Sequence, residues 1–281
     1  MTTATVIEPR SRSTRAPITT QRQTLGRAIH SEWIKIRTLR STWIGLGTVL
    51  LILIGIGAIG ALLSTGALPD DDGDGFGGDG PLATVLTGAD FAVLLVGVLG
   101  ALAGAREYSS RMITATVAAV PRRWQVVVSK AVALTAVVLP TALLGVLATF
   151  GIGMAILSSG DGATVALTDS GVLRELLGMA GYITSIALIG LGLGVLLRSV
   201  AGSIAALVAG VLLLPALAGG LLPDSWDSIL QYLPSSAAAA FTTVLAAGDS
   251  VLSSGAGALV LAAWVAISLG AAARAITRRD V

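Results

Sequence analysis

The stretch REYSSRMITATVAAVPRRWQVVVSK, residues Arg106 to Lys130, separates two long apolar runs. It carries five of the chain's 18 Lys and Arg residues and a single acid, Glu107. The rest of the chain is very different, because 54% of all residues are hydrophobic. We therefore expect this basic insert to be the place where a membrane protein meets a soluble partner.

The composition around the insert is that of an integral membrane protein. Only 12% of residues are charged, and the mean hydropathy is +0.87. A membrane-spanning helix needs about 20 mostly apolar residues, and the chain offers six such runs, at about 43–63, 87–105, 131–157, 172–197, 200–222 and 255–273. The fold prediction is an all-α, polytopic membrane protein whose six-span domain covers residues 43–281, with no room for a soluble catalytic domain.

The N-terminal part precedes the first span in two pieces. Residues 1–22 are polar and lack apolar periodicity, which predicts a disordered tail. Residues 23–42 are expected to form an amphipathic helix at the membrane interface, with His30 as a surface residue at headgroup level and not a proton relay. Its apolar positions recur at helical spacing, at Leu25, Ile29, Trp33, Ile36 and Leu39.

Two loops between the spans are rich in acids. The segment PDDDGDGFGGDG, residues 69–80, has five Asp residues but lacks the closing Glu of a calcium loop, so a solvated acidic hairpin is favoured over a calcium site. Residues 223–254 are too apolar for a free loop and too broken for a span. They predict a re-entrant outer loop of two short helices.

The distribution of charge predicts the orientation. On one side of the six predicted spans lie 17 of the 18 basic residues, and the other side has only Arg174. The positive-inside rule then makes the insert and both termini cytoplasmic. Sixteen Arg against two Lys, with abundant Ala and Gly, indicate a bacterial genome and hence the bacterial cytoplasmic membrane.

The predicted spans hold few polar features. Asp90 is the one ionisable group expected within them, near the outer end of the second span. Glycines at helix-packing spacings, Gly100 with Gly104 and Gly190 with Gly194, indicate close helix contacts. Ion-coupled transporters carry buried charges, and channels carry filters or charged rings, so both classes are disfavoured.

The chain also lacks a way to use ATP by itself. A nucleotide-hydrolysing loop needs Gly-Lys-Ser/Thr, whereas the two lysines, Lys35 and Lys130, follow Ile34 and Ser129. The absence of Cys excludes disulfides and Cys-based metal sites. We expect no catalytic, cofactor or metal residues, so energy must come from outside the membrane domain.

Within the insert, one apolar stripe has helical spacing. Ser109 and Ser110 can cap a helix that Pro121 ends. The stripe itself consists of Met112, Ile113, Thr116, Val117 and Val120. A short amphipathic helix is predicted, and composition alone favours a docking element and an ordinary basic surface loop about equally.

Three segments resemble the permease subunits of type-2 ATP-binding-cassette exporters: SEWIKIRTLRSTW, REYSSRMITATVAAVPRRWQVVVSKA and YLPSSAAAAFT. The resemblance follows the order of elements over about residues 25 to 281. It implies that the segment between spans two and three is a cytoplasmic coupling helix seated on a separate ATPase subunit. It also implies that the N-terminal helix supports that contact, and that two permeases, identical or different, assemble with two ATPases.

The resemblance assigns roles to particular residues. The ATPase contact would consist of Glu107, Tyr108, Arg111, Met112, Ile113, Thr116, Val117, Val120, Arg122 and Arg123. The supporting helix would contribute Trp33, Ile36 and Arg37. ATP and Mg would bind the partner ATPase, and this chain would bind no cofactor. The chain would contact membrane lipid and would not bind nucleic acid.

The expected function is that of an exporter permease that forms the translocation path. One alternative is a non-transporting membrane anchor or signalling-associated protein. A second alternative is a secondary transporter.

Overall fold

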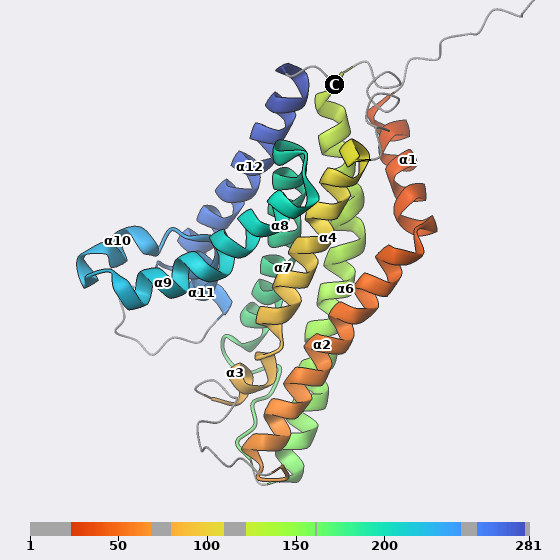
Figure 1. Ribbon diagram of the computed structural model, residues 1–281. Helices are drawn as coiled ribbons and strands as arrows, with labels where there is room; N and C mark the ends of the chain where they lie inside the picture. The colour runs from red at the N-terminus through yellow and green to blue at the C-terminus, as the bar shows by residue number, and fades with distance from the viewer. Residues whose placement is uncertain (1–23, 69–79, 110–121, 161, 243–251, 279–281) are drawn as a thin grey trace, which may run out of the picture.

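A computed structural model describes residues 24–68, 80–109, 122–160, 162–242 and 252–278. Within these ranges every regular element is a helix (Figure 1), which confirms the all-α prediction. In chain order the elements are α1 (Leu25–Thr38), α2 (Arg40–Ser64), α3 (Pro81–Leu86), α4 (Ala89–Ser109), α6 (Trp124–Ser159), α7 (Val172–Leu197), α8 (Val200–Val208), η1 (Ala209–Leu213), α9 (Leu214–Leu221), η2 (Asp224–Trp226), α10 (Asp227–Leu230), α11 (Pro234–Thr242) and α12 (Ser254–Arg278).

Within the described ranges, six helical segments are long and apolar enough to cross a membrane. They are Arg40–Ser64, Pro81–Tyr108, Trp124–Ser159, Val172–Leu197, Val200–Ala218 and Ser254–Arg278. Each overlaps one of the six apolar runs of the sequence, so the chain is a multi-pass membrane protein as predicted. The third helix begins earlier than expected, at Trp124, which places Lys130 inside a helix.

The centre of the bundle is the contact between α4 and α7, which run side by side in the same direction. Gly100 lies against the backbone carbonyl of Ala187, and Gly104 lies against that of Leu191. Gly190 in turn lies against the backbone of α4. A Cβ atom would not fit at these positions, so the two backbones touch directly. The prediction that these glycines serve helix packing is confirmed.

The longest helix, α6, packs against the two N-terminal helices, α1 and α2. Its 36 residues correspond to about 54 Å, well beyond the roughly 30 Å of a hydrocarbon layer. Helix α2 packs along α6, and α1 packs against it as well (Figure 1). Because α6 is continuous through Pro140, it links one end of the bundle to the other.

The fifth span is a continuous helical segment, as the sequence predicted, and it contains a π-helical turn. The wider turn η1 separates α8 from α9, and Pro215 follows it in the first turn of α9. Proline lacks an amide hydrogen and clashes with the carbonyl four residues earlier, which accounts for the local widening. Beyond it, α9 and α10 stand apart from α2 and α6 (Figure 1).

The segment that precedes the last span contains η2, α10 and α11. The nine residues of α11 pack against α7 and α12. Short helices therefore form here, while re-entry of this loop into the membrane stays a prediction.

Helix α1 contacts the bundle through a face that includes a carboxylate. Its buried residues are Ala28 and Glu32, whereas Trp33 and Ile34, which are apolar, are 38% and 48% exposed. The exposed apolar side chains thus face away from the protein, while a carboxylate faces inward.

Candidate functional site

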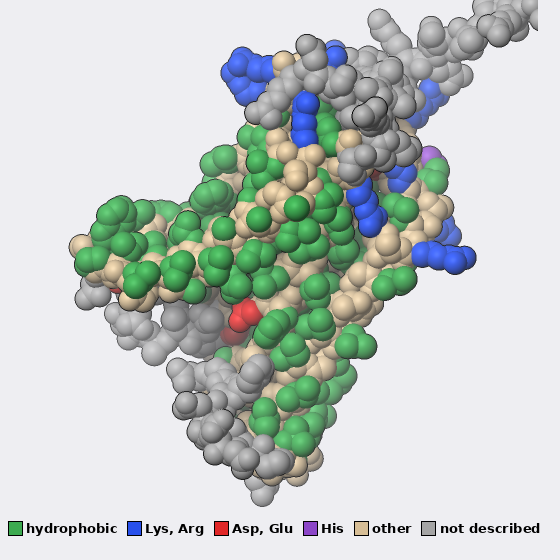
Figure 2. All heavy atoms as spheres, in the orientation of Figure 1, with side chains coloured by type: hydrophobic (Ala, Val, Ile, Leu, Met, Phe, Trp, Pro, Cys, Tyr) green, Lys and Arg blue, Asp and Glu red, His purple; other side chains and the backbone are tan. Residues whose placement is uncertain are grey.

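Basic side chains gather at one end of the bundle, at the top of Figure 2. Among the described residues, Arg174 is the exception, because it lies in the first turn of α7 at the other end. We call these the basic end and the opposite end. At the basic end α4 ends and α6 begins, so the insert between them is anchored there.

The last turn of α4 contacts four other parts of the chain through three successive residues. Arg106 donates a hydrogen bond from Nη1 to Ser41 Oγ of α2, at 3.1 Å. Glu107 accepts hydrogen bonds from Lys35 of α1 and from Lys130 of α6. The ring of Tyr108 lies 5.1 Å from the guanidinium carbon of Arg198, between α7 and α8. The residues that lead into the insert are therefore joined to four neighbouring segments.

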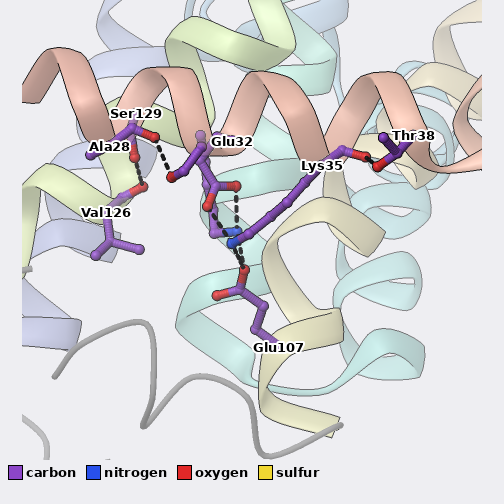
Figure 3. Close-up of polar contacts among 9 residues, drawn as sticks. Ala28, Glu32, Lys35, Thr38, Glu107, Val126 and Ser129 are labelled. Carbon is purple, nitrogen blue, oxygen red and sulfur yellow. Dashed lines mark hydrogen bonds and ion pairs between the residues drawn. The ribbon is translucent and has the colours of Figure 1, made fainter. Parts of the chain in front are cut away.

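At the centre of this arrangement is a cluster of two acids and two bases, which we call the four-charge cluster: Glu32, Lys35, Glu107 and Lys130. Lys130 Nζ lies 3.0 Å from Glu32 Oε2 and 2.7 Å from Glu107 Oε1. Lys35 Nζ lies 2.6 Å from Glu32 Oε1 and 2.9 Å from Glu107 Oε1. Figure 3 shows Glu32 and Lys35 descending from α1 to meet Glu107 of α4. Each base bridges both acids, so the cluster is closed.

The four members differ in exposure. The side chains of Lys130 and Glu32 are each 7% exposed, that of Glu107 is 12% exposed and that of Lys35 is 40% exposed. Burial disfavours the charge on Lys35, but the hydrogen bonds to Glu32 and Glu107 outweigh it and raise the Lys35 pKa above its ordinary value. A buried charge whose partner is removed is strongly destabilising, so the cluster constrains the relative positions of α1, α4 and α6.

An apolar layer adjoins the cluster at the basic end. Val126 and Val127 of α6 pack with Val195 of α7 and Ile276 of α12. Tyr108 packs against this group from α4. The ends of four helices therefore pack together at the base of the insert.

The residues predicted to contact a partner fall into three groups. Glu107 and Tyr108 lie in α4 and contact the protein's own helices. Arg122 is exposed and Arg123 half-buried just before α6. Arg111, Met112, Ile113, Thr116, Val117 and Val120 lie outside the described residues. Contact of any of these with a partner stays a prediction.

The predicted supporting residues all lie on α1. Trp33 and Arg37 are exposed, and Ile36 packs against the main hydrophobic core. The structure adds Glu32 and Lys35 of the same helix as the residues that contact α4 and α6.

Charged residues within the helices were underestimated from the sequence. Besides Asp90, the acids and the lysine of the six long helices are Glu107, Glu175 and Lys130, and all three are largely buried. The detectable signal was that Glu107 and Lys130 each border a long apolar run. The pairing of Lys130 with Glu32, however, depends on a contact between residues 98 positions apart in sequence.

No group of three or more His, Cys, Asp or Glu residues suited to a metal occurs among the described residues. The four-charge cluster joins the ends of α1, α4 and α6. Such a cluster can hold these helices in one arrangement, and it can transmit a displacement of one helix to the other two. Neither a family model nor a curated protein sequence matches this chain.

Proposed function

We propose that this chain is the permease subunit of an ATP-driven exporter, coupled to a separate ATPase subunit at the basic end. The observation that carries the proposal is the last turn of α4, where three successive residues contact α1, α2, α6 and the link between α7 and α8. A force applied to the adjoining insert would reach the membrane helices through these contacts.

The proposed mechanism needs two arrangements of the helices. ATP and Mg bind the partner ATPase, and ATP binding displaces the insert. Because the four-charge cluster makes α1, α4 and α6 respond together, that displacement biases the bundle between inward-open and outward-open states. The energy comes from the partner, and this chain supplies the path.

The proposed orientation of the chain in the membrane follows from the distribution of its basic residues. Positive residues gather at the basic end, and the positive-inside rule puts that end in the bacterial cytoplasm, together with both termini. The pairing of two permeases is supported by the fifth span, since 11% of its apolar window is buried, against 67% for the fourth span. A second permease would cover part of that surface, and lipid the remainder.

The test is co-purification of the tagged chain from its native membranes. Met112→Asp combined with Ile113→Asp is expected to leave insertion into the membrane intact but abolish recovery of an ATPase. Leu167→Asp, at an exposed position at the opposite end, is the matched control and should retain the ATPase. Recovery of an ATPase with the double variant at the wild-type level would refute the assigned docking segment. Recovery of a kinase or regulator instead would favour the signalling-associated alternative.

A further inference from the structure

The junction between α1 and α2 forms an elbow at the edge of the bundle (Figure 1). The chain turns there through one extended residue between the two helices. Two side chains stabilise the turn. Trp43 donates a hydrogen bond from Nε1 to the carbonyl oxygen of Arg37, at 3.0 Å, and Arg106 of α4 donates one to Ser41. The elbow is therefore held both within the N-terminal part and from the centre of the bundle.

Arginines from three helices are placed at the elbow. Arg37 lies in the last turn of α1, and Arg40 is the first residue of α2. Arg106 reaches the same place from α4, because its hydrogen-bond acceptor, Ser41, is the next residue after Arg40. All three arginines are exposed. The elbow thus presents guanidinium groups on the outer surface of the protein.

The acids close to this surface are already paired. In the described parts of α1 and α2 and in the last turn of α4, these acids are Glu32 and Glu107. Both contact Lys35 and Lys130 within the four-charge cluster. Two acids and two bases sum to zero charge. The arginines of α1 and α2 therefore give the elbow a net positive charge, which attracts anions.

An exposed apolar stripe continues from the elbow along α2. Residues four or seven positions apart lie on the same face of a helix, so Arg40, Ile44 and Leu51 share one face. The side chains of Ile44 and Leu51 are 68% and 71% exposed. Leu51 lies about 16 Å from Arg40 along the helix axis, within a segment suited to span the membrane. One face of α2 thus combines a charged end with an open apolar stripe.

An exposed aromatic ring marks the boundary between these two parts. Trp43 lies between Arg40 and Ile44 in sequence, and its ring is exposed. Tryptophan is enriched at the level of the lipid headgroups, where its polar and apolar parts are both accommodated. The charged end of the stripe therefore matches the headgroup level, and the apolar part matches the hydrocarbon.

We propose that the elbow and the stripe on α2 form a binding site for one anionic phospholipid. Its phosphate would lie at Arg37 and Arg40, since guanidinium groups bind phosphate through paired, charge-assisted hydrogen bonds. One acyl chain would lie along Ile44 and Leu51. Free phosphate would leave the apolar stripe unused, and a soluble protein would not reach Leu51 inside the membrane. The proposal concerns lipid binding and does not rest on the exporter assignment.

The test is native mass spectrometry of the full chain in detergent, titrated with phosphatidylglycerol or with phosphatidylcholine of the same acyl chains. Phosphatidylglycerol should bind more tightly, because the arginines repel the choline cation. Arg37→Gln combined with Arg40→Gln should weaken its binding by about tenfold or more and remove the preference. Arg274→Gln combined with Arg278→Gln is the matched control, since it removes two exposed arginines of α12. This control should keep the preference.

A second pair of measurements tests the apolar half of the site. Leu51→Ala removes apolar contact with the acyl chain and should weaken phosphatidylglycerol binding by about two- to fivefold. Glycerol 1-phosphate, which has the phosphate without the chains, should not compete at equal concentration. The melting temperature of each variant verifies that it is folded.

Two results would overturn the site. One is equal affinity of the wild-type chain for the two lipids. The other is an unchanged preference in the variant that lacks Arg37 and Arg40. If that variant kept its lipid preference but lost a co-purified ATPase, the face would belong to a protein partner. Lipid binding is measured on the chain alone, so failure of this site is distinguishable from failure of the exporter assignment.

Discussion

Two glutamates at the two ends of the bundle have similar burial and opposite surroundings. Glu107, at the basic end, accepts hydrogen bonds from Lys35 and Lys130 and joins three helices. Glu175, near the opposite end, is 2% exposed and forms no salt bridge within the described part of the chain. The same residue type therefore links three helices in one place and lies buried without a salt bridge in the other. The proposed ATPase contact belongs to the first of these ends.

The largest effect is expected from breaking the paired end. Lys130→Met leaves Glu32 and Glu107 buried with only the half-exposed Lys35 between them. The expected loss is about 3–5 kcal/mol of unfolding free energy, because unpaired buried charges are expensive. Equilibrium unfolding in mixed SDS and dodecylmaltoside micelles measures it.

A second substitution provides the control for that variant. Glu107→Gln added to Lys130→Met restores charge balance through the Glu32–Lys35 pair, so part of the lost stability should return. Equal or greater instability of the double variant would show that the cluster is not held by charge pairing.

The contact between α4 and α7 is expected to be the next most sensitive part of the bundle. Gly100→Ala places a methyl group against the Ala187 carbonyl and should cost about 1–3 kcal/mol, as overpacked cores do. Gly151→Ala, on α6, meets no atom within 4 Å and should be neutral or slightly stabilising, since Ala favours helices. Thermal unfolding compares the pair, and equal melting temperatures would contradict the close packing of α4 on α7.

Replacing each glutamate by leucine sharpens the contrast between the ends. Glu175→Leu removes a buried carboxyl group and should raise the unfolding free energy by about 1–2 kcal/mol. Glu107→Leu should lower it, because Lys130 then loses one of its two acids. A decrease for both variants would mean that Glu175 has a stabilising partner after all.

The smallest effect concerns Lys35, which is the most exposed member of the cluster. Lys35→Met should cost about 0.2–1 kcal/mol, as for pairs near the surface. The Lys35 pKa is raised in the folded protein, so its contribution is fully present below the unfolded value of about 10.4 and is lost as pH rises further. The difference between wild type and Lys35→Met should be constant from pH 6 to 9 and shrink above about pH 10.5. A difference that changes between pH 6 and 9 would assign the effect to another group.

The fold could be predicted because long apolar runs are a local signal. Each of the six spans stands out in the sequence, and the glycines of α4 and α7 indicated close packing. Two local features were missed. Pro215 follows a π-helical turn within the fifth span, and the face of α1 that packs on the bundle carries Glu32. Both depend on how a helix meets its neighbours.

The candidate site was less accessible from the sequence. The insert stood out by its charge, but Glu32 and Lys130 are 98 residues apart and pair only through tertiary packing. The same holds for Gly178 and Phe241, which pack against each other from different helices. Periodicity shows which residues share a face of one helix. It contains no information about which residues of another helix lie against that face.

The most direct test of the central claim is site-specific photo-cross-linking in native membranes. A photoreactive amino acid at Arg122, exposed at the base of the insert, is compared with one at Leu167, exposed at the opposite end. We predict that the probe at position 122 captures a protein with a nucleotide-hydrolysing loop and that the probe at position 167 does not. Capture of no ATPase at position 122, or of the ATPase at position 167, would contradict coupling at the basic end.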